Sequence, residues 1–244
     1  MEIEASEIAG EYWYPGHDGG SFLYAGGIIT ALSGRASAIN NVGQVVGEMS
    51  RASSASPAAF LWTSGTLTDL GMLGGNGAHA SAINDVGQVV GFAHLAGNST
   101  VHAFLYSGEV LTDLGTLGGA NSVAFGINST GQIAGSSQIA GNGPQHAFLY
   151  SRGLMTDLGT LGGTESQADG IDSRGLIVGW SRTASGAQRA FLWSSGRMLD
   201  LNGIAPISPG VALMEATAIN DLGQIVANGS NDRAYLITLP PQLR

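Results

Sequence analysis

Two columns of variable residues hold the side chains of this sequence that could do chemistry. Both columns are counted back from an Asn or Asp that recurs at positions 40, 84, 128, 172 and 220. Five residues before this anchor stand Arg35, His79, Val123, Gln167 and Glu215, and three residues before it stand Ser37, Ser81, Phe125, Asp169 and Thr217. A carboxylate beside an imidazole tunes the imidazole pKa for general acid–base catalysis, and a guanidinium binds anions.

The columns supply both catalytic and binding candidates. If the protein is an enzyme, His79 is the expected acid or base, Asp169 or Glu215 is its carboxylate partner, and Arg35 holds an anion. The other residues of the columns that could contact a ligand are Gln167, Phe125, Ser37, Ser81 and Thr217. The alternative interpretation is that all these side chains are merely solvated.

The residues between the columns are constant, and they indicate how the columns are positioned. Four and two residues before each anchor the residue is always Ala or Gly, and directly before it stands Ile. Because side chains alternate along a strand, the variable columns share one side and the small residues share the other. If this strand is the innermost of a repeated sheet, the variable residues converge near one mouth of a central channel.

The anchor belongs to a repeat with spacings of 44, 44, 44 and 48 residues. A second segment reads Ala-Phe-Leu followed by Trp or Tyr at 59–62, 103–106, 147–150 and 190–193, and a third reads Leu-Thr-Asp-Leu-Gly or a close variant at 67–71, 111–115 and 155–159. Each repeat thus holds four short apolar segments separated by Gly, Asn and Asp turns. This pattern predicts an all-β protein, a β-propeller of four-stranded blades. A two-sheet sandwich does not explain the strict period.

The sequence favours six blades in a single domain covering residues 1–244. The expected repeats are residues 1–33, 34–77, 78–121, 122–165, 166–213 and 214–244. In the first repeat, Ile8–Tyr12, Ser21–Tyr24 and Ile28–Leu32 match the second, third and fourth strands of a blade, and the last repeat ends without a fourth strand. In the alternative with five blades, Ile28–Leu32 completes the last blade as a closing strand.

The chain is acidic, with 18 Asp or Glu, 9 Arg, no Lys and a net charge of −9 in 244 residues. Nucleic acids and anionic membranes are bound through clustered Lys and Arg, so neither is an expected partner. The sequence has no Cys, which excludes disulfides and thiolate metal sites. No apolar run of about 18 residues predicts membrane insertion. The start of the chain shows no signal peptide, as in a cytoplasmic protein or an exported one without its leader.

These segments resemble the HAF-type repeat, a family of extracellular bacterial repeats named for the sequence His-Ala-Phe. The match is literal at residues 102–104 and 146–148, Asp-Leu-Gly-Thr-Leu-Gly-Gly at 113–119 and 157–163 fits the same pattern, and the resemblance extends over about residues 34–238. Arg189 and Arg233 replace the histidine, and the N-terminal repeat departs from the pattern. The resemblance implies the fold and an extracellular or periplasmic location, and it carries no reaction, cofactor or catalytic residue. His102 and His146 occupy its consensus site and are expected to be structural.

Further chemistry is sparse in the sequence. Motifs for a nucleophilic serine, a zinc protease, a phosphate loop or a dinucleotide site do not occur, and we expect no metal and no cofactor. The Asn- and Asp-rich turns have the wrong spacing for calcium loops and serve as hairpin turns. One irregular stretch near the N-terminus adds binding candidates, since exposed aromatic residues stack on sugars or anchor proteins, although they could equally cap an incomplete blade: Tyr12, Trp13, Tyr14 and His17.

Three functions remain open, because a fold by itself assigns none. The leading hypothesis is a non-catalytic propeller that binds a small molecule, a glycan or a protein through the channel mouth and the adjoining loops. The second is a small-molecule enzyme, a hydrolase, lyase, isomerase or cyclase. The third is a structural repeat domain of a larger surface protein. The oligomeric state is not predicted.

Overall fold

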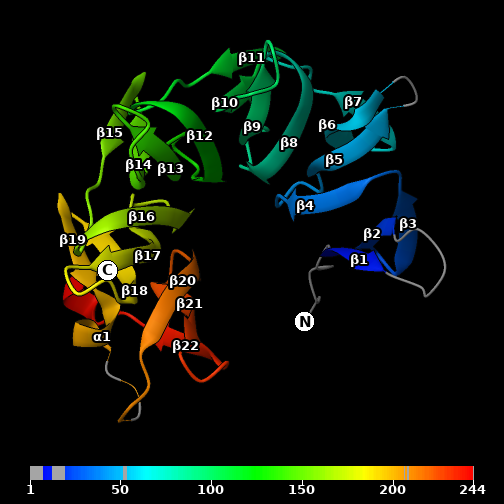
Figure 1. Ribbon diagram of the computed structural model, residues 1–244. Helices are drawn as coiled ribbons and strands as arrows, with labels where there is room; N and C mark the ends of the chain where they lie inside the picture. Colours follow the sequence, from blue (N-terminus) through cyan, green and yellow to red (C-terminus); the bar gives the residue numbers. More distant parts are fainter. Residues whose placement is uncertain (1–7, 13–19, 52–53, 206, 208, 244) are drawn as a thin grey trace. The chain divides into compact units, whose positions relative to one another are not determined.

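The structure is a computed structural model that describes residues 8–12, 20–51, 54–205, 207 and 209–243. The chain divides after Asp113 into two compact units, and each unit contains three antiparallel sheets (Figure 1). No helix within the described ranges is both long and apolar enough to cross a membrane.

The first unit consists of one three-stranded sheet and two four-stranded sheets, with strands in chain order across each sheet. The three-stranded sheet is formed by β1 (Ile8–Tyr12), β2 (Gly20–Ala25) and β3 (Ile28–Leu32). The second sheet is formed by β4 (Arg35–Ile39), β5 (Val45–Arg51), β6 (Ser54–Thr63) and β7 (Thr66–Asp69). The third is formed by β8 (Gly74–Ile83), β9 (Val89–Leu95), β10 (Val101–Ser107) and β11 (Val110–Asp113).

The second unit has the reverse order, two four-stranded sheets followed by a three-stranded one. The first of these is formed by β12 (Gly118–Ile127), β13 (Ile133–Ile139), β14 (Gln145–Ser151) and β15 (Leu154–Asp157). The next is formed by β16 (Gly162–Ile171), β17 (Ile177–Thr183), β18 (Gln188–Ser194) and β19 (Arg197–Asp200). The last is formed by β20 (Leu213–Ile219), β21 (Gln224–Gly229) and β22 (Ala234–Thr238), and two short helices, α1 (Leu201–Ile204) and η1 (Pro241–Leu243), flank it in the chain.

The six sheets are six blades, as the repeat predicts. The pairing of β3 decides the number, because Ile28–Leu32 pairs with β2 over the whole strand and so belongs to a blade of its own. The first blade contains the second, third and fourth strands of a repeat, and the last contains the first three. The fold is therefore the six-bladed β-propeller rather than the five-bladed alternative.

The constant Phe of the third strand forms the centre of each complete blade. Phe60, Phe104, Phe148 and Phe191 are all fully buried. In the first unit, Phe104 packs with Val46 and Ala59 of the preceding sheet, so it contributes to the contact between two blades. Burial of apolar area of this kind is the main stabilising contribution to an all-β fold that has no disulfide and, in the residues that the structure describes, no long helix.

A β-bulge lies at the same place in the first strand of every blade from the second to the last. In β4 the register passes from Ala36, opposite Gly47, to Ala38, opposite Val46, and Ser37 is the extra residue. The same shift occurs in β8, β12, β16 and β20. The extra residue is always the one three before the anchor. The residues of this column therefore have no partner in the register of the first two strands.

The Leu-Gly-Gly sequence explains why three first strands are longer than the others. It opens β8, β12 and β16, each of which has ten residues, and its leucine forms a parallel bridge to the second strand, as in Leu73 with Leu95. By the 44-residue period, residues 30–33 correspond to Gly74–Gly77, but they form the end of β3 and the turn after it. Consequently β4 has only five residues, and the end of β5 has no counterpart of the bridge that Leu73 and Gly74 form with Leu95 at the end of β9.

Candidate functional site

The structure brings three of the predicted residues of the first unit into one polar cluster. Nε2 of His79 on β8 lies 3.4 Å from Oγ of Ser37 on β4, and Nδ1 of His79 lies 3.2 Å from Oε2 of Glu48 on β5. Nη1 of Arg35 lies 3.6 Å from the other carboxylate oxygen of Glu48, Oε1. The ring of His79 also stacks on Phe92, with ring centroids 5.4 Å apart. The cluster therefore joins an imidazole, a hydroxyl, a carboxylate and a guanidinium from two neighbouring blades.

Glu48 is the residue that sequence reasoning missed. It lies on the second strand directly opposite Arg35, and the same position holds Phe92 opposite His79 and Trp180 opposite Gln167. This column, directly after the constant Val-Val-Gly or its equivalent, is as variable as the two predicted ones. The variability of this column was therefore visible in the sequence. Antiparallel pairing of the first two strands places the column directly opposite the residues five before the anchor, and so beside the site.

The cluster is partly shielded from water. The side chains of Glu48 and His79 are 25% and 28% exposed, and that of Arg35 is 69% exposed. Ser37 is also exposed. The carboxylate–imidazole contact is therefore more protected than the hydroxyl and the guanidinium, which solvent or a ligand can reach.

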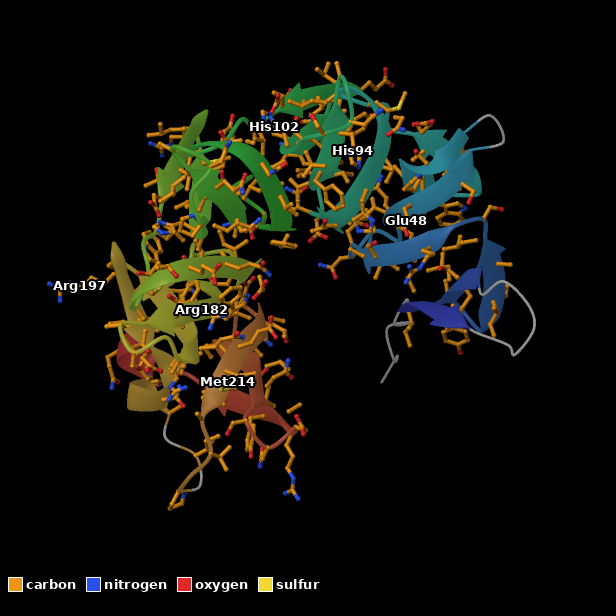
Figure 2. All side chains as sticks on the ribbon, viewed as in Figure 1. Glu48, His94, His102, Arg182, Arg197 and Met214 are labelled. Atoms are coloured by element: carbon orange, nitrogen blue, oxygen red, sulfur yellow. The ribbon has the colours of Figure 1, made fainter. Side chains whose placement is uncertain are left out.

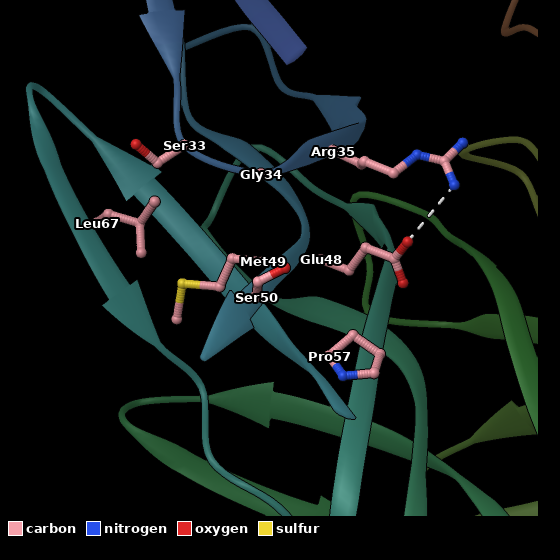
Figure 3. A pocket seen from close by; sticks show the side chains of 8 residues that line it. All are labelled: Ser33, Gly34, Arg35, Glu48, Met49, Ser50, Pro57 and Leu67. Atoms are coloured by element: carbon pink, nitrogen blue, oxygen red, sulfur yellow. Dashed lines mark ion pairs between the residues drawn. The ribbon is translucent and has the colours of Figure 1, made fainter. Parts of the chain in front are cut away.

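A cavity of about 600 Å³ adjoins the cluster at the edge of β5. It is lined by Ser33, Gly34, Arg35, Glu48, Met49, Ser50, Pro57 and Leu67. Figure 3 shows Met49 and Leu67 on one side of β5 and the Arg35–Glu48 ion pair on the other. In the following blade, the ten-residue strand β8 extends along the end of β9. The five-residue strand β4 is too short to extend along the end of β5 in the same way, and the cavity lies at this place.

The second unit contains the other candidate carboxylates. Nε2 of Gln167 donates a hydrogen bond of 2.7 Å to Oδ1 of Asp169, so the residues five and three before the anchor lie on the same side of β16. Oδ2 of Asp169 is buried and has no hydrogen-bond partner in the described part of the chain. Burial raises the pKa of Asp169 to about 7, the hydrogen bond from Gln167 lowers it, and the negative charge of Glu215 raises it. Asp169 is therefore a proton-binding group near neutral pH.

The remaining predicted residues of the columns lie on the first strands of their blades, and those of the last blade contact the neighbouring strand. Ser81 lies at the bulge of β8, and Val123 and Phe125 lie on β12. Glu215 accepts a hydrogen bond of 3.4 Å from Nδ2 of Asn228, and Oγ1 of Thr217 donates one of 3.4 Å to the Val226 carbonyl, both between β20 and β21. Trp13, Tyr14 and His17 lie outside the described residues, and Tyr12 is described only as the backbone end of β1.

His102 and His146 make the same contact in different blades. Nδ1 of His102 lies 2.9 Å from Oδ1 of Asp113, and Nδ1 of His146 lies 2.8 Å from Oδ2 of Asp157. Each pair links the third strand of a blade to the fourth. Figure 2 shows His102 and Glu48 on different sheets of the first unit, and within the sheet of His102 the strand β9 separates β10 from β8, which carries His79. Within the described ranges, no group of three or more His, Asp or Glu residues could hold a metal ion.

Comparison with known proteins identifies the fold and not a family. No protein-family model and no curated protein matches the chain. Among solved structures, the crystal structure of TolB from Acinetobacter baumannii is similar, with a TM-score of 0.53 and 14% sequence identity. The match covers 86% of this chain and 56% of the TolB chain, so this chain corresponds to little more than half the TolB structure. At this identity the likeness shows the six-bladed β-propeller fold alone.

Proposed function

We propose that this chain is a ligand-binding β-propeller whose site is the cavity beside β5 together with the cluster around Glu48. One observation carries this proposal: a cavity of about 600 Å³ adjoins a group of hydrogen-bonding side chains at the variable positions of the repeat. This volume lies within the range of pockets that hold small molecules, about 300–1,000 Å³. Met49, Pro57 and Leu67 give the cavity an apolar wall, and Ser33 and Ser50 add hydroxyl groups.

The charges of the site favour an uncharged ligand with carbonyl or hydroxyl groups. The positive charge of Arg35 is balanced by the carboxylate of Glu48, to which it is ion-paired. An anionic ligand would compete with Glu48 for Arg35, and a cationic ligand would compete with Arg35 for Glu48. A neutral sugar, amide or ester can accept hydrogen bonds from the guanidinium without displacing the carboxylate. The ligand classes that fit are therefore small neutral molecules and glycans.

The resemblance to HAF-type repeats supports a second part of the proposal, an extracellular or periplasmic location. Glycans and small esters are accessible to a protein outside the cytoplasm. Fractionation of the native organism with an antibody against the chain tests this part. Recovery of the protein only with the cytoplasmic fraction would contradict it.

The binding proposal is tested by filling the cavity. Saturation-transfer NMR is recorded on the full chain with neutral monosaccharides and disaccharides, N-acetyl amino-acid amides and short-chain esters. Ser50 is exposed and lines the cavity, so Ser50→Trp should abolish the signal of any ligand bound there. Ser185→Trp, at an exposed serine of the second unit, is the matched control and should leave the signal unchanged.

Two results would count against the binding proposal. If none of these ligand classes gives a signal, the cavity is not a binding site for neutral small molecules, and a structural repeat domain is favoured. If Ser50→Trp binds as well as the original chain, the ligand binds elsewhere. Far-ultraviolet circular dichroism of both tryptophan variants checks that each has folded.

A second candidate function, a small-molecule enzyme, is favoured by one specific observation. The imidazole of His79 has a carboxylate within hydrogen-bond distance, that of Glu48, beside the cavity. A carboxylate in this position orients the imidazole of a histidine that acts as a general base.

A further inference from the structure

We propose that Ser37, His79 and Glu48 form a nucleophile, base and acid triad that hydrolyses small neutral esters bound in the adjoining cavity. This inference rests on the proposed function, because the cavity is where the substrate would bind. The observation that carries it is the sequence of contacts from Ser37 Oγ to His79 Nε2, 3.4 Å, and from His79 Nδ1 to Glu48 Oε2, 3.2 Å. The roles in a Ser-His-carboxylate triad are recognised by this geometry rather than by sequence order.

The position of the histidine ring selects the tautomer that the reaction needs. An ionised carboxylate is only an acceptor, so Nδ1, which faces Glu48, carries the proton. Nε2 is then unprotonated and faces Ser37, where it can accept the hydroxyl proton. The stacking on Phe92, with an angle of 25° between the ring planes, limits rotation of the imidazole out of this orientation. The contacts therefore hold the neutral ring of His79 in the orientation and tautomer of a general base.

Ser37 has the accessibility that a nucleophile requires. It is exposed, and as the extra residue of the β-bulge it has no partner in the register of β4 with β5. Bulges occur next to active sites because they redirect a side chain out of the sheet. A distance of 3.4 Å from hydroxyl to imidazole is long for a hydrogen bond, and such contacts in ligand-free enzymes shorten when substrate binds.

Arg35 completes the site for a neutral carbonyl compound. It precedes Ser37 by two residues on β4, and its guanidinium is ion-paired with Glu48 at 3.6 Å and largely exposed. Because the guanidinium is largely exposed, the carbonyl oxygen of a bound ester can approach it, and their attraction strengthens as negative charge develops on that oxygen. Arg35 and Glu48 belong both to the cluster and to the cavity lining, so the substrate class is an uncharged ester whose carbonyl lies at the cluster and whose apolar part extends into the cavity.

The reaction balances with water as the only co-reactant. Oγ of Ser37 forms a bond to the ester carbonyl carbon while its proton moves to Nε2 of His79. The bond from carbon to the alcohol oxygen then breaks, and the alcohol leaves with that proton. Water attacks the resulting acyl-serine, gives a proton to Nε2 and releases the carboxylic acid as Oγ takes the proton back. The carboxylate of Glu48 stabilises the protonated imidazole in both halves.

The test is covalent labelling of the full chain. A fluorophosphonate reacts with an activated serine hydroxyl, and intact-protein and peptide mass spectrometry then locate the adduct. We expect one adduct at Ser37 in the original chain, none in Ser37→Ala, and labelling at least about 100-fold slower in His79→Ala. Glu48→Gln should slow labelling about 10-fold or more, because the amide no longer stabilises the imidazolium. Ser185→Ala, at an exposed serine whose hydroxyl contacts only Thr183 among the described residues, should label normally.

The rate of p-nitrophenyl acetate hydrolysis gives a second measurement, and we expect it to decrease among the variants in the same order as the labelling rate. The triad is overturned if the original chain is not labelled, or if Ser37→Ala is labelled and hydrolyses the ester at the same rate. Ligand binding measured by NMR separates this failure from failure of the proposed function. A chain that binds neutral ligands in the cavity but is not labelled is a binding protein without the triad, and a chain that does neither contradicts both proposals.

Discussion

The side-chain amide of Asn40 donates a hydrogen bond of 3.0 Å to the backbone carbonyl of Asn84, the corresponding residue of the next blade. The same contact joins Asn128 to the carbonyl of Asp172, at 2.9 Å. The other groups of the Asn40 side chain close its own turn, because Oδ1 accepts from the backbone N–H groups of Val42 and Gln44. The anchor residue thus has two structural roles, in its own turn and between blades, and this explains its recurrence.

Loss of the bond between blades should be measurable as a loss of stability. In Asn40→Ala, the buried carbonyl of Asn84 loses one partner and keeps the hydrogen bond from the Gly87 N–H. Beyond the effect of losing the turn contacts, we therefore expect the free energy of unfolding to fall by a further amount of about 0.5–1.5 kcal/mol, the value of one hydrogen bond. Asn220→Ala is the matched control, because Asn220 closes the same turn but is exposed and contacts no further blade in the described residues. Urea denaturation of both variants gives the comparison. Equal losses would mean that the contact with Asn84 contributes nothing.

The Gly that recurs in the second strand of the four complete blades should not tolerate a side chain in the third blade. A Cβ atom on Gly91 would overlap the backbone carbonyl oxygen of His79, at the start of the bulge in β8. We expect Gly91→Ala to lower the free energy of unfolding by about 1–3 kcal/mol, because the backbone must move to make room. The last blade already has a buried alanine at this position, Ala227, so Ala227→Gly should cost about 1 kcal/mol or less. Thermal unfolding distinguishes the two, and a neutral Gly91→Ala would contradict the interpretation.

The architecture was predictable because successive blades repeat the same strand and turn segments in the same order. The spacing of the anchors and the Ala-Phe-Leu segments located the strands, and even the degenerate strand Ile8–Tyr12 was found from its likeness to the others. The number of blades depended on one long-range pairing, that of β3 with β2, which sequence similarity suggested but could not decide. The short helix α1 was not foreseen, and it lies in the one repeat with a spacing of 48 residues, where the extra chain has room for it.

The candidate site was less predictable than the blade. The variable columns led to Arg35, His79 and Ser37, which the structure does bring together. The partner of the imidazole was missed, because Glu48 belongs to another strand and contacts His79 across two blades. The cavity was missed as well. It lies where β4 lacks the Leu-Gly-Gly extension of β8, β12 and β16, and no residue pattern in the sequence marks the position of an absent segment.

His102 and His146 should contribute little to the stability of the fold. His102 and Asp113 form a pair near the surface, with 18% and 39% of the side chains exposed. Solvent weakens such pairs, so His102→Gln should lower the free energy of unfolding by about 1 kcal/mol or less. Labelling at Ser37 and ligand binding should be unchanged, because the pair links β10 and β11, and β9 separates these strands from β8, which carries His79. A large loss of ligand binding in a folded His102→Gln chain would assign the histidine a functional role instead.

The buried carboxyl of Asp169 should make the stability of the protein depend on pH between about 4 and 7. Its pKa is about 7 in the folded chain, against about 3.9 in an unfolded one. Between these values the folded chain binds more protons than the unfolded chain, so the free energy of unfolding falls as the pH rises. The contribution is fully present below about pH 4 and is lost as the pH passes through 7.

Asp169→Asn isolates this effect, because the amide has nearly the shape of a protonated carboxyl and its oxygen can still accept the bond from Gln167. At pH 4 the variant and the original chain should be equally stable. At pH 8 the variant should be more stable by about 2–4 kcal/mol, because it lacks the ionised carboxylate of Asp169. In the original chain that carboxylate is near the negative charge of Glu215, and its Oδ2 is buried with no hydrogen-bond partner among the described residues. Denaturant unfolding across this pH range measures the difference, and the other carboxylates cancel because both chains contain them. A difference that stays constant from pH 4 to pH 8 would mean that Asp169 titrates in the same range whether the chain is folded or not.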